Sequence, residues 1–177
     1  MERSRPATLF KGPPEAPGRS GRFDVASRRT ALESLRSTSF RTQSAGPILI
    51  TGESGAGKTR LWNRLAGEAP PNWRFAVVQA ASSLDAVDFL GLTAAQLGVE
   101  PSDRLATNRL AIASALQDES TDGRAWVLVV ENVHQAAPEI WAEIEALAAG
   151  AAKGPTREFA TVLLVGRTEL ARRLSTR

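Results

Sequence analysis

The sequence predicts an α/β fold in which a parallel sheet is covered by helices on both faces. Short apolar runs alternate with helical segments along the chain, which is the order expected of βαβ units. The runs are continuously apolar, as strands buried on both faces are. A glycine-rich turn joins the first apolar run to the first helical segment, and such a junction is a common place for an anion-binding site.

The composition limits the kinds of site that the chain can carry. Its 177 residues, of which 42% are hydrophobic, suit one compact domain. The absence of cysteine and the presence of only one histidine exclude disulfides, thiolate zinc sites, cysteine nucleophiles and multi-histidine metal sites. No apolar run approaches the roughly 20 residues of a membrane span, and no secretory signal is visible. We therefore expect a soluble, cytoplasmic protein with no direct membrane insertion.

The net charge of +3 is unevenly distributed. Residues 1–44 hold nine basic and four acidic side chains, residues 167–177 hold four and one, and the part between them is acidic. Basic ends suit an anionic partner such as DNA, but solvated basic tails explain them equally well. Because the aromatic and basic residues do not interleave, DNA binding is a secondary hypothesis.

The elements follow one another in a regular order. Residues 1–22, rich in proline, glycine and arginine, are predicted to form a disordered leader, and residues 23–177 the domain. A loose helix is expected within residues 23–40. Strands are predicted at 48–50, 74–80, 126–130 and 161–165, and helices at 58–67, 84–97, 104–119, 138–149 and from near Glu169. The apolar residues expected in the third and fourth of these helices are Leu105, Leu110, Ile112 and Leu116, and Ile140, Trp141, Ile144 and Leu147.

The glycine-rich turn has the spacing of a phosphate-binding loop. Residues 52–59 read GESGAGKT, which satisfies G-x-x-x-x-G-K-[ST] between a strand and a helix. Glycines let several backbone N–H groups point at one phosphate, and the helix N-terminus adds a positive dipole. Lys58 is expected to reach the β- and γ-phosphates, and Thr59 to present its hydroxyl to Mg²⁺. The expected nucleotide contacts are Gly52, Glu53, Ser54, Gly55, Ala56, Gly57, Lys58, Thr59 and Arg60.

Such a loop needs a carboxylate for the Mg²⁺ shell at the end of a neighbouring buried strand. Glu131 follows the strand at 126–130 and is predicted to fill this role together with Thr59. Asn132 stands where a hydrolytic site usually places the carboxylate that polarises the attacking water. Because an amide cannot accept that proton, we expect slow turnover. The alternatives are that Glu131 itself acts as the base, or that it only ends a strand.

Three further features leave their roles open. The strand at 161–165 leads to Arg167 and Thr168, either of which could sense the γ-phosphate, although Arg167 could equally be solvated beside a turn at Gly166. His134 is expected to be a loop residue and not a catalytic one. The four tryptophans, Trp62, Trp73, Trp126 and Trp141, are expected to serve packing.

Three blocks resemble the ExeA-like branch of the AAA+ ATPases, within the P-loop NTPase class. GESGAGKT at 52–59 resembles the Walker A motif, VLVVENVHQAAPE at 127–139 the block with the catalytic acids, and VLLVGRTEL at 162–170 a Val-Gly-Gln-Pro-Glu-Leu block. The resemblance covers about residues 23–177. It implies a three-layer sandwich of the ASCE type with ATP and Mg²⁺ as cofactors.

The departures from the family pattern shape what we expect of function. Glu131 replaces an aspartate, Asn132 replaces the catalytic glutamate, and Arg167-Thr168 replaces Gln-Pro. The family's fifth strand and helical lid, with its sensing arginine, would come after the last residue of this chain. Without that strand, the strand at 48–50 would lie on an exposed edge of the sheet. We therefore expect either that the chain is a fragment of a longer one, or that a partner, which is another copy or another protein, covers this edge. Candidate arginine fingers are Arg172, Arg173 and Arg177.

Two functions remain in competition at this stage. One is an AAA+ module that binds ATP and can hydrolyse it slowly. The other is a non-hydrolysing nucleotide-binding module that is regulatory or DNA-associated, as in transposition. Adenine is favoured over guanine because the chain has no Asn-Lys-x-Asp segment.

Overall fold

The structure is a computed structural model, and it describes residues 47–153, 159 and 161–170. The expected leader at 1–22, the loose helix within 23–40 and the candidate arginine fingers lie outside the described residues. The boundary of the domain at residue 23 is therefore a proposal.

The described elements follow the predicted order closely. The strands are β1 (Ile48–Thr51), β2 (Trp73–Gln79), β3 (Ala125–Glu131) and β4 (Thr161–Gly166). The helices are α2 (Lys58–Gly67), α3 (Ala86–Gln96), α4 (Leu105–Thr121) and α5 (Pro138–Lys153), and the sequence gives no warning of the short 3₁₀ helix η1 (Val133–Gln135). Asp85 begins α3 as its N-cap, because its carboxylate accepts from the Asp88 backbone N–H at 2.8 Å.

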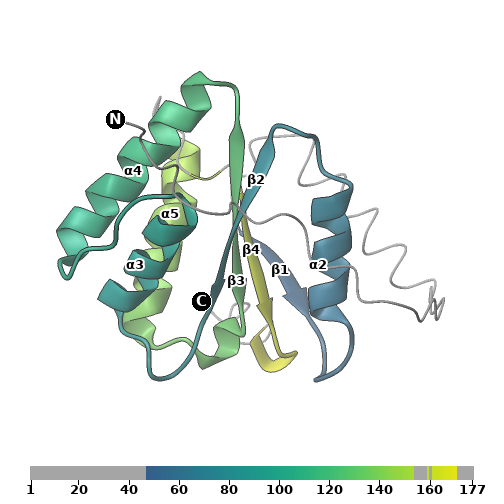
Figure 1. Cartoon of the computed structure of the whole chain (residues 1–177). Coiled ribbons are helices and arrows are strands. Elements are labelled where there is room, and N and C mark those ends of the chain that lie inside the picture. Colours follow the sequence, from purple (N-terminus) through teal and green to yellow (C-terminus); the bar gives the residue numbers. More distant parts are fainter. Residues whose placement is uncertain (1–46, 154–158, 160, 171–177) are drawn as a thin grey trace, which may run out of the picture.

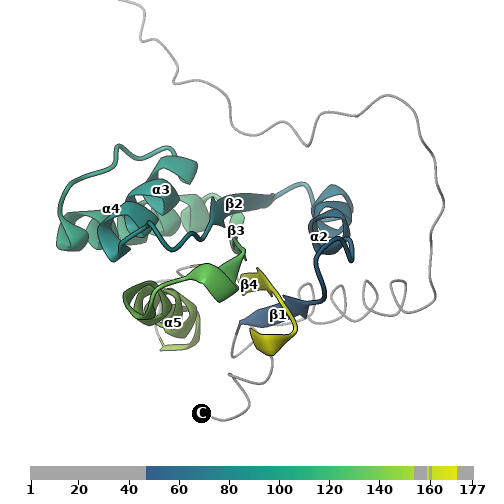
Figure 2. The ribbon, with the colours of Figure 1, turned by 90° about the horizontal axis from the view of Figure 1, so that it is seen from below.

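The four described strands form one parallel sheet in the order β1-β4-β3-β2. Figure 1 shows α2 on one face of this sheet and α3, α4 and α5 on the other. The predicted α/β sandwich with a parallel sheet is thus confirmed. Figure 2 looks onto the edge where the strands end and shows the same two helical layers on either side.

Alternate residues of the central strands enter two separate cores. On the α2 face, Val127, Val129, Leu163 and Val165 pack with Ile50, Trp62 and Leu65. On the other face, Leu128, Val130, Val162 and Leu164 pack against α3, α4 and α5, with Phe89, Ile112, Leu116, Ile140 and Ile144 among the partners. A strand buried on both faces takes apolar residues at successive positions, which explains why the apolar runs are continuous.

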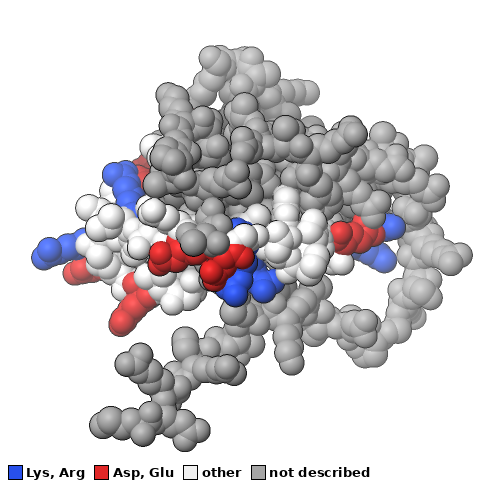
Figure 3. All heavy atoms as spheres, turned by 90° about the horizontal axis from the view of Figure 1, so that it is seen from above, with Lys and Arg blue, Asp and Glu red and all other residues white. Residues whose placement is uncertain are grey.

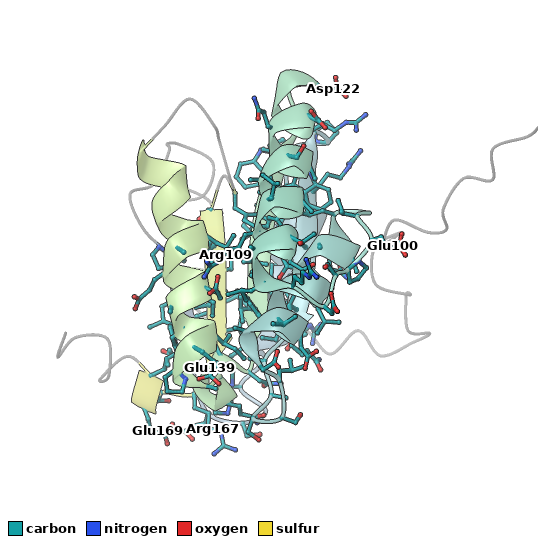
Figure 4. The ribbon with its side chains drawn as sticks, turned by 90° about the vertical axis from the view of Figure 1, so that its left-hand side faces the viewer. Glu100, Arg109, Asp122, Glu139, Arg167 and Glu169 are labelled. Atoms are coloured by element: carbon teal, nitrogen blue, oxygen red, sulfur yellow. The ribbon has the colours of Figure 1, made fainter. Side chains whose placement is uncertain are left out.

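Helix α4 buries only part of its apolar residues. Ile112 and Leu116 are buried, whereas Leu110 is 73% exposed. The helix is held to α5 by an ion pair in which Arg109 Nε donates to Glu143 Oε2 at 2.9 Å and Nη2 donates to Oε1. Figure 4 shows Arg109 between these two helices. Glu143 is buried, so its carboxylate has lost its contact with water, and the ion pair with Arg109 compensates for that loss.

Strand β1 lies at one edge of the sheet that the structure describes. Of its residues only Ile50 is buried, while Ile48, Leu49 and Thr51 are partly exposed. This matches the expectation that an apolar strand lies at an edge. In the described ranges, no helix combines the length and the apolar character that crossing a membrane requires.

Candidate functional site

Three segments meet where the strands end, on the side seen in Figure 2. They are the loop at 52–57 after β1, the segment at 131–135 that begins with the last residue of β3, and the segment at 166–170 that begins with the last residue of β4. Strand β4 lies between β1 and β3, so the expectation that the acidic residue follows a strand adjacent to β1 was wrong. The side chain of Glu131 nevertheless reaches the start of α2, as its hydrogen bonds show.

The loop at 52–57 has the backbone that its glycines were predicted to allow. Gly55 has a φ of 75° and Gly57, the N-cap of α2, has a φ of 83°, both in the left-handed region. The Ala56 backbone N–H donates to the Glu53 carbonyl at 3.1 Å and closes a tight turn. The loop therefore leads directly into the first turn of a ten-residue helix.

Lys58 folds back over this loop. Its Nζ donates to the carbonyl oxygens of Gly52 and Glu53, each at 2.9 Å. An ammonium group has three N–H donors, so these two bonds leave one for another acceptor. The loop thus holds a positive charge at the end of α2 where the helix dipole is also positive, which favours an anion.

Glu131 is the centre of a buried hydrogen-bond cluster. Its Oε1 accepts from Thr59 Oγ1 at 2.7 Å and from Trp62 Nε1 at 2.9 Å. Its Oε2 accepts from Gln79 Nε2 at 3.4 Å, across the register pair that joins β2 to β3. The side chain of Glu131 is thereby tied to α2 and to β2 at once.

Asn132 begins η1 in an unusual backbone conformation. Its φ of 54° is the one positive φ at a residue other than glycine within the described residues. Asparagine adopts this left-handed conformation more readily than most residues do. Its carbonyl accepts from the Gln135 N–H at 2.8 Å, and its side chain is exposed at the surface of the site.

The end of β4 packs closely against these elements. A Cβ on Gly166 would lie 2.9 Å from Leu170 Cδ2 and 3.2 Å from Val133 Cγ1, so a larger residue there would require these side chains to move. Beyond it, Thr168 Oγ1 donates to Glu53 Oε1 at 3.0 Å, which joins this segment to the loop. Arg167 is exposed at the same end of the domain as Glu169, as Figure 4 shows.

His134 lies in η1 and is partly buried. Burial lowers its pKa below the ordinary value of 6.5, and the charges of Arg167 and Lys58 lower it further, while Glu169 opposes them. Its Nδ1 is buried and has no hydrogen-bond partner among the described residues. His134 was expected to be a loop residue, and it lies in the short helix η1 between β3 and α5, close to charged groups of the site.

A family model described as an AAA domain matches residues 41–174. The chain belongs to the AAA domain family. This match and the fold make the protein an AAA+ nucleotide-binding module of the P-loop ATPase class. No curated protein matches the chain.

Two solved structures share the fold of this AAA domain. The crystal structure of Cdc6p from Pyrobaculum aerophilum matches with a TM-score of 0.61 and 17% identity, over 82% of this chain and 40% of that one. The structure of Drosophila ORC bound to DNA matches with a TM-score of 0.55 and 13% identity, over 95% of this chain and 50% of that one. This AAA domain thus spans half or less of the chains that it resembles.

The AAA domain brings most of the sequence-predicted residues to one edge of the sheet. Thr59 donates to Glu131, Lys58 donates to two carbonyls of the loop, and Thr168 donates to Glu53 in the same loop. Ser54, Gly55, Ala56 and Arg60 are exposed around the loop and the first turn of α2.

Two residues of the cluster had no place in the sequence-based site. Trp62 was expected only to pack, and Gln79 was not considered, yet both donate to Glu131. Trp62 lies three positions after Thr59 on one helix, and Gln79 pairs with Glu131 in the sheet register. The helical spacing was visible in the sequence, whereas the register was not.

The oxygen donors of the site in this AAA domain fit Mg²⁺. Among the described residues, no three His, Cys, Asp or Glu side chains gather to hold a metal. Mg²⁺, however, is usually bound by one or two protein oxygens together with substrate phosphates and waters. The hydroxyl of Thr59 and the carboxylate of Glu131, 2.7 Å apart, are a donor set of this kind.

Proposed function

We propose that the chain binds ATP together with Mg²⁺ at the loop 52–59 and hydrolyses it slowly. The observation that carries the proposal is the 2.7 Å hydrogen bond from Thr59 to Glu131. It joins the residue that follows the phosphate-binding lysine to a buried carboxylate two strands away. This is the pairing that a nucleotide-bound Mg²⁺ requires, and it links segments 72 positions apart.

The residues have distinct roles in this proposal. The loop and Lys58 bind the phosphates, with the ammonium moving from the Gly52 and Glu53 carbonyls to a stronger, charged acceptor. Thr59 and Glu131 hold Mg²⁺, which neutralises charge on the phosphate oxygens when it is bound. Arg167 or Thr168 lies at the end of β4, where a side chain can respond to the γ-phosphate.

Slow hydrolysis follows from Asn132. The side chain is exposed at the start of η1, directly after Glu131, and its amide cannot take a proton from water. Glu131 is a poor substitute as the base because the proposal assigns its carboxylate to the Mg²⁺ shell. The chain is therefore proposed as an ATP-binding module whose bound state persists.

Binding is tested by titrating the purified chain with Mg-ATP. The wild type is expected to bind, and Lys58→Ala is expected to lose binding by 100-fold or more, roughly the effect of removing a charged phosphate contact. Arg64→Ala is the matched control, since it removes a cation from the same helix where it pairs with Glu68. A wild type that binds no nucleotide contradicts the proposal, and so does an equal loss in both variants.

Hydrolysis is tested by restoring a carboxylate at position 132. Because the residue has a positive φ, Asn132→Asp is the better variant, since aspartate adopts this conformation more readily than glutamate does. We expect turnover to rise by roughly 10² or more in one of Asn132→Asp and Asn132→Glu. Fast, Lys58-dependent turnover by the wild type would overturn the slow-hydrolysis proposal.

A second candidate is a DNA-associated regulatory module. Its support is the excess of basic residues at 1–44 and 167–177, and one of the structures with this fold is of ORC bound to DNA. On the face of the domain shown in Figure 3, acidic and basic side chains of the described residues lie next to one another. DNA affinity that falls steeply with salt, and that disappears when residues 1–44 are removed, would support this candidate.

The branch and the partner are also proposals. The blocks at 127–139 and 162–170 support the ExeA-like branch of the AAA+ ATPases. Strand β1 at the sheet edge supports a partner that covers it, and a second copy of the chain is the simplest one. Sedimentation with and without Mg-ATP tests for such self-association.

A further inference from the structure

We propose that Trp62 is a positioning residue, whose indole N–H fixes the carboxylate of Glu131 for the metal. The inference rests on the proposed function and extends it to a residue that the phosphate-binding motif does not contain. The indole Nε1 lies 2.9 Å from Glu131 Oε1, and both side chains are buried, with exposed fractions of 4% and 8%.

The two donors on α2 act on one oxygen of the carboxylate. Thr59 and Trp62 are three positions apart, so they lie on the same face of the helix, and both donate to Oε1. The other oxygen, Oε2, has only the long 3.4 Å contact with Gln79 among the described residues. The carboxylate is therefore held through Oε1, and Oε2 keeps the lone pairs that a metal or its bound water can use.

Trp62 is the donor to Glu131 that takes no part in the proposed metal binding. In the proposed function the oxygen of Thr59 is a ligand of Mg²⁺ through a lone pair, whereas the indole N–H of Trp62 serves Glu131 alone. The indole is rigid, buried in the core beneath α2 with Leu65 and Val129, and cannot turn to another acceptor. Partners of this kind, which orient a ligand without touching the metal, commonly change metal affinity by roughly 10- to 100-fold.

The length of Glu131 is matched to this donor. A glutamate places its carboxylate one methylene further from β3 than an aspartate would, toward the second donor on α2. We therefore infer that Glu131 and Trp62 work as a pair. In a Glu131→Asp background the carboxylate is one methylene further from the donors on α2, so Trp62 is expected to contribute less.

Trp126 provides a matched control for the loss of packing. It is also buried, with an exposed fraction of 5%, but its Nε1 has no hydrogen-bond partner among the described residues. Trp62→Phe and Trp126→Phe thus remove the same atoms from two cores, and only the first removes a described bond to Glu131.

The first experiment measures ATP binding as a function of Mg²⁺ concentration. Trp62→Phe is expected to raise the Mg²⁺ concentration at half-effect by roughly tenfold while leaving metal-free ATP binding within about twofold. Trp126→Phe is expected to leave the Mg²⁺ dependence unchanged. In the Glu131→Asp background, Trp62→Phe is expected to have less than about twofold effect, which is the signature of a coupled pair.

The second experiment needs no nucleotide. In the ¹H–¹⁵N spectrum of the wild type, the indole resonance that disappears in Trp62→Phe is expected at a hydrogen-bonded, downfield position. It is expected to move upfield in Glu131→Ala, while the Trp126 resonance stays in place.

The outcomes separate this inference from the proposed function. A wild type that binds no nucleotide overturns both. Two other outcomes overturn only the role of Trp62 when the wild type does bind nucleotide. One is an unchanged Mg²⁺ dependence in Trp62→Phe, and the other is an indole resonance that does not move in Glu131→Ala. If Trp62→Phe weakens metal-free and Mg²⁺-dependent binding equally, the residue serves packing and the inference is wrong.

Discussion

The hydroxyl of Thr168 donates to the carboxylate of Glu53 at 3.0 Å, which joins the end of β4 to the phosphate-binding loop. Both residues are exposed, and they lie 115 positions apart in the chain. The bond anchors a carboxylate in the loop that the proposed function assigns to a triphosphate. Glu53 is thus held near groups of its own charge.

Removing this charge is predicted to strengthen ATP binding. Glu53→Gln keeps an oxygen that accepts from Thr168 but carries no negative charge. Two like charges about 4 Å apart in water repel by about 1 kcal/mol, so affinity for ATP should rise by roughly threefold to fivefold at low salt. Calorimetric titration at two salt concentrations checks this, since the gain should shrink as screening increases. Unchanged or weaker binding in Glu53→Gln contradicts the prediction.

The backbone of the loop makes a prediction about stability. Gly57 has a φ of 83°, so Gly57→Ala is expected to cost about 1–2 kcal/mol of unfolding free energy. Gly67, at the other end of α2, has open space around its missing Cβ and no positive φ, so Gly67→Ala should stabilise by about 0.5–1 kcal/mol. Urea unfolding of the two variants measures the sign and size of each change in unfolding free energy. Equal changes in the two variants would show that the loop conformation is not required.

The ion pair between α4 and α5 makes a third prediction. The buried Glu143 accepts two hydrogen bonds from Arg109, and these bonds raise the pKa of Arg109 further above its usual range. Arg109→Met leaves a buried carboxylate without this partner and should cost about 1–3 kcal/mol. The double variant Arg109→Met, Glu143→Leu should recover most of that loss, because it removes the unpaired charge. Thermal unfolding compares the two, and a double variant no more stable than Arg109→Met contradicts the explanation.

The sequence predicted the elements well because their physical causes are local. Continuous apolar runs produced the strands, and a single octapeptide, GESGAGKT, located the loop and the start of α2. Which apolar residues of α4 are buried is less local, since Ile112 and Leu116 are buried whereas Leu110 is exposed. The order of the strands, with β4 between β1 and β3, depends on packing between distant segments.

The same distinction applies to the site. Thr59 and Glu131 were predicted together as Mg²⁺ ligands because a magnesium ion bound to a nucleotide takes a hydroxyl and a carboxylate from the protein. Trp62 and Gln79 were missed because their contribution depends on where Glu131 points once the strands are in register. A tryptophan on an apolar helix face is usually a packing residue, so only the structure reveals the direction of its N–H.

The protonation of His134 makes the last prediction. Burial lowers its pKa in the folded state, with Arg167 and Lys58 acting in the same direction and Glu169 against them. The unfolded chain therefore takes up the proton first, near the ordinary value of 6.5, and stability is lost as the pH falls from there through the lower folded pKa. The loss has a limiting slope of about 1.4 kcal/mol per pH unit for one proton.

Because His134 is the single histidine of the chain, its imidazole resonance titrates without overlap in NMR spectra. The midpoint should lie below 6.5, and His134→Gln should reduce the dependence of unfolding free energy on pH between about 7 and 5. A midpoint at or above 6.5 would mean that the charge of Glu169 outweighs burial and the two cations.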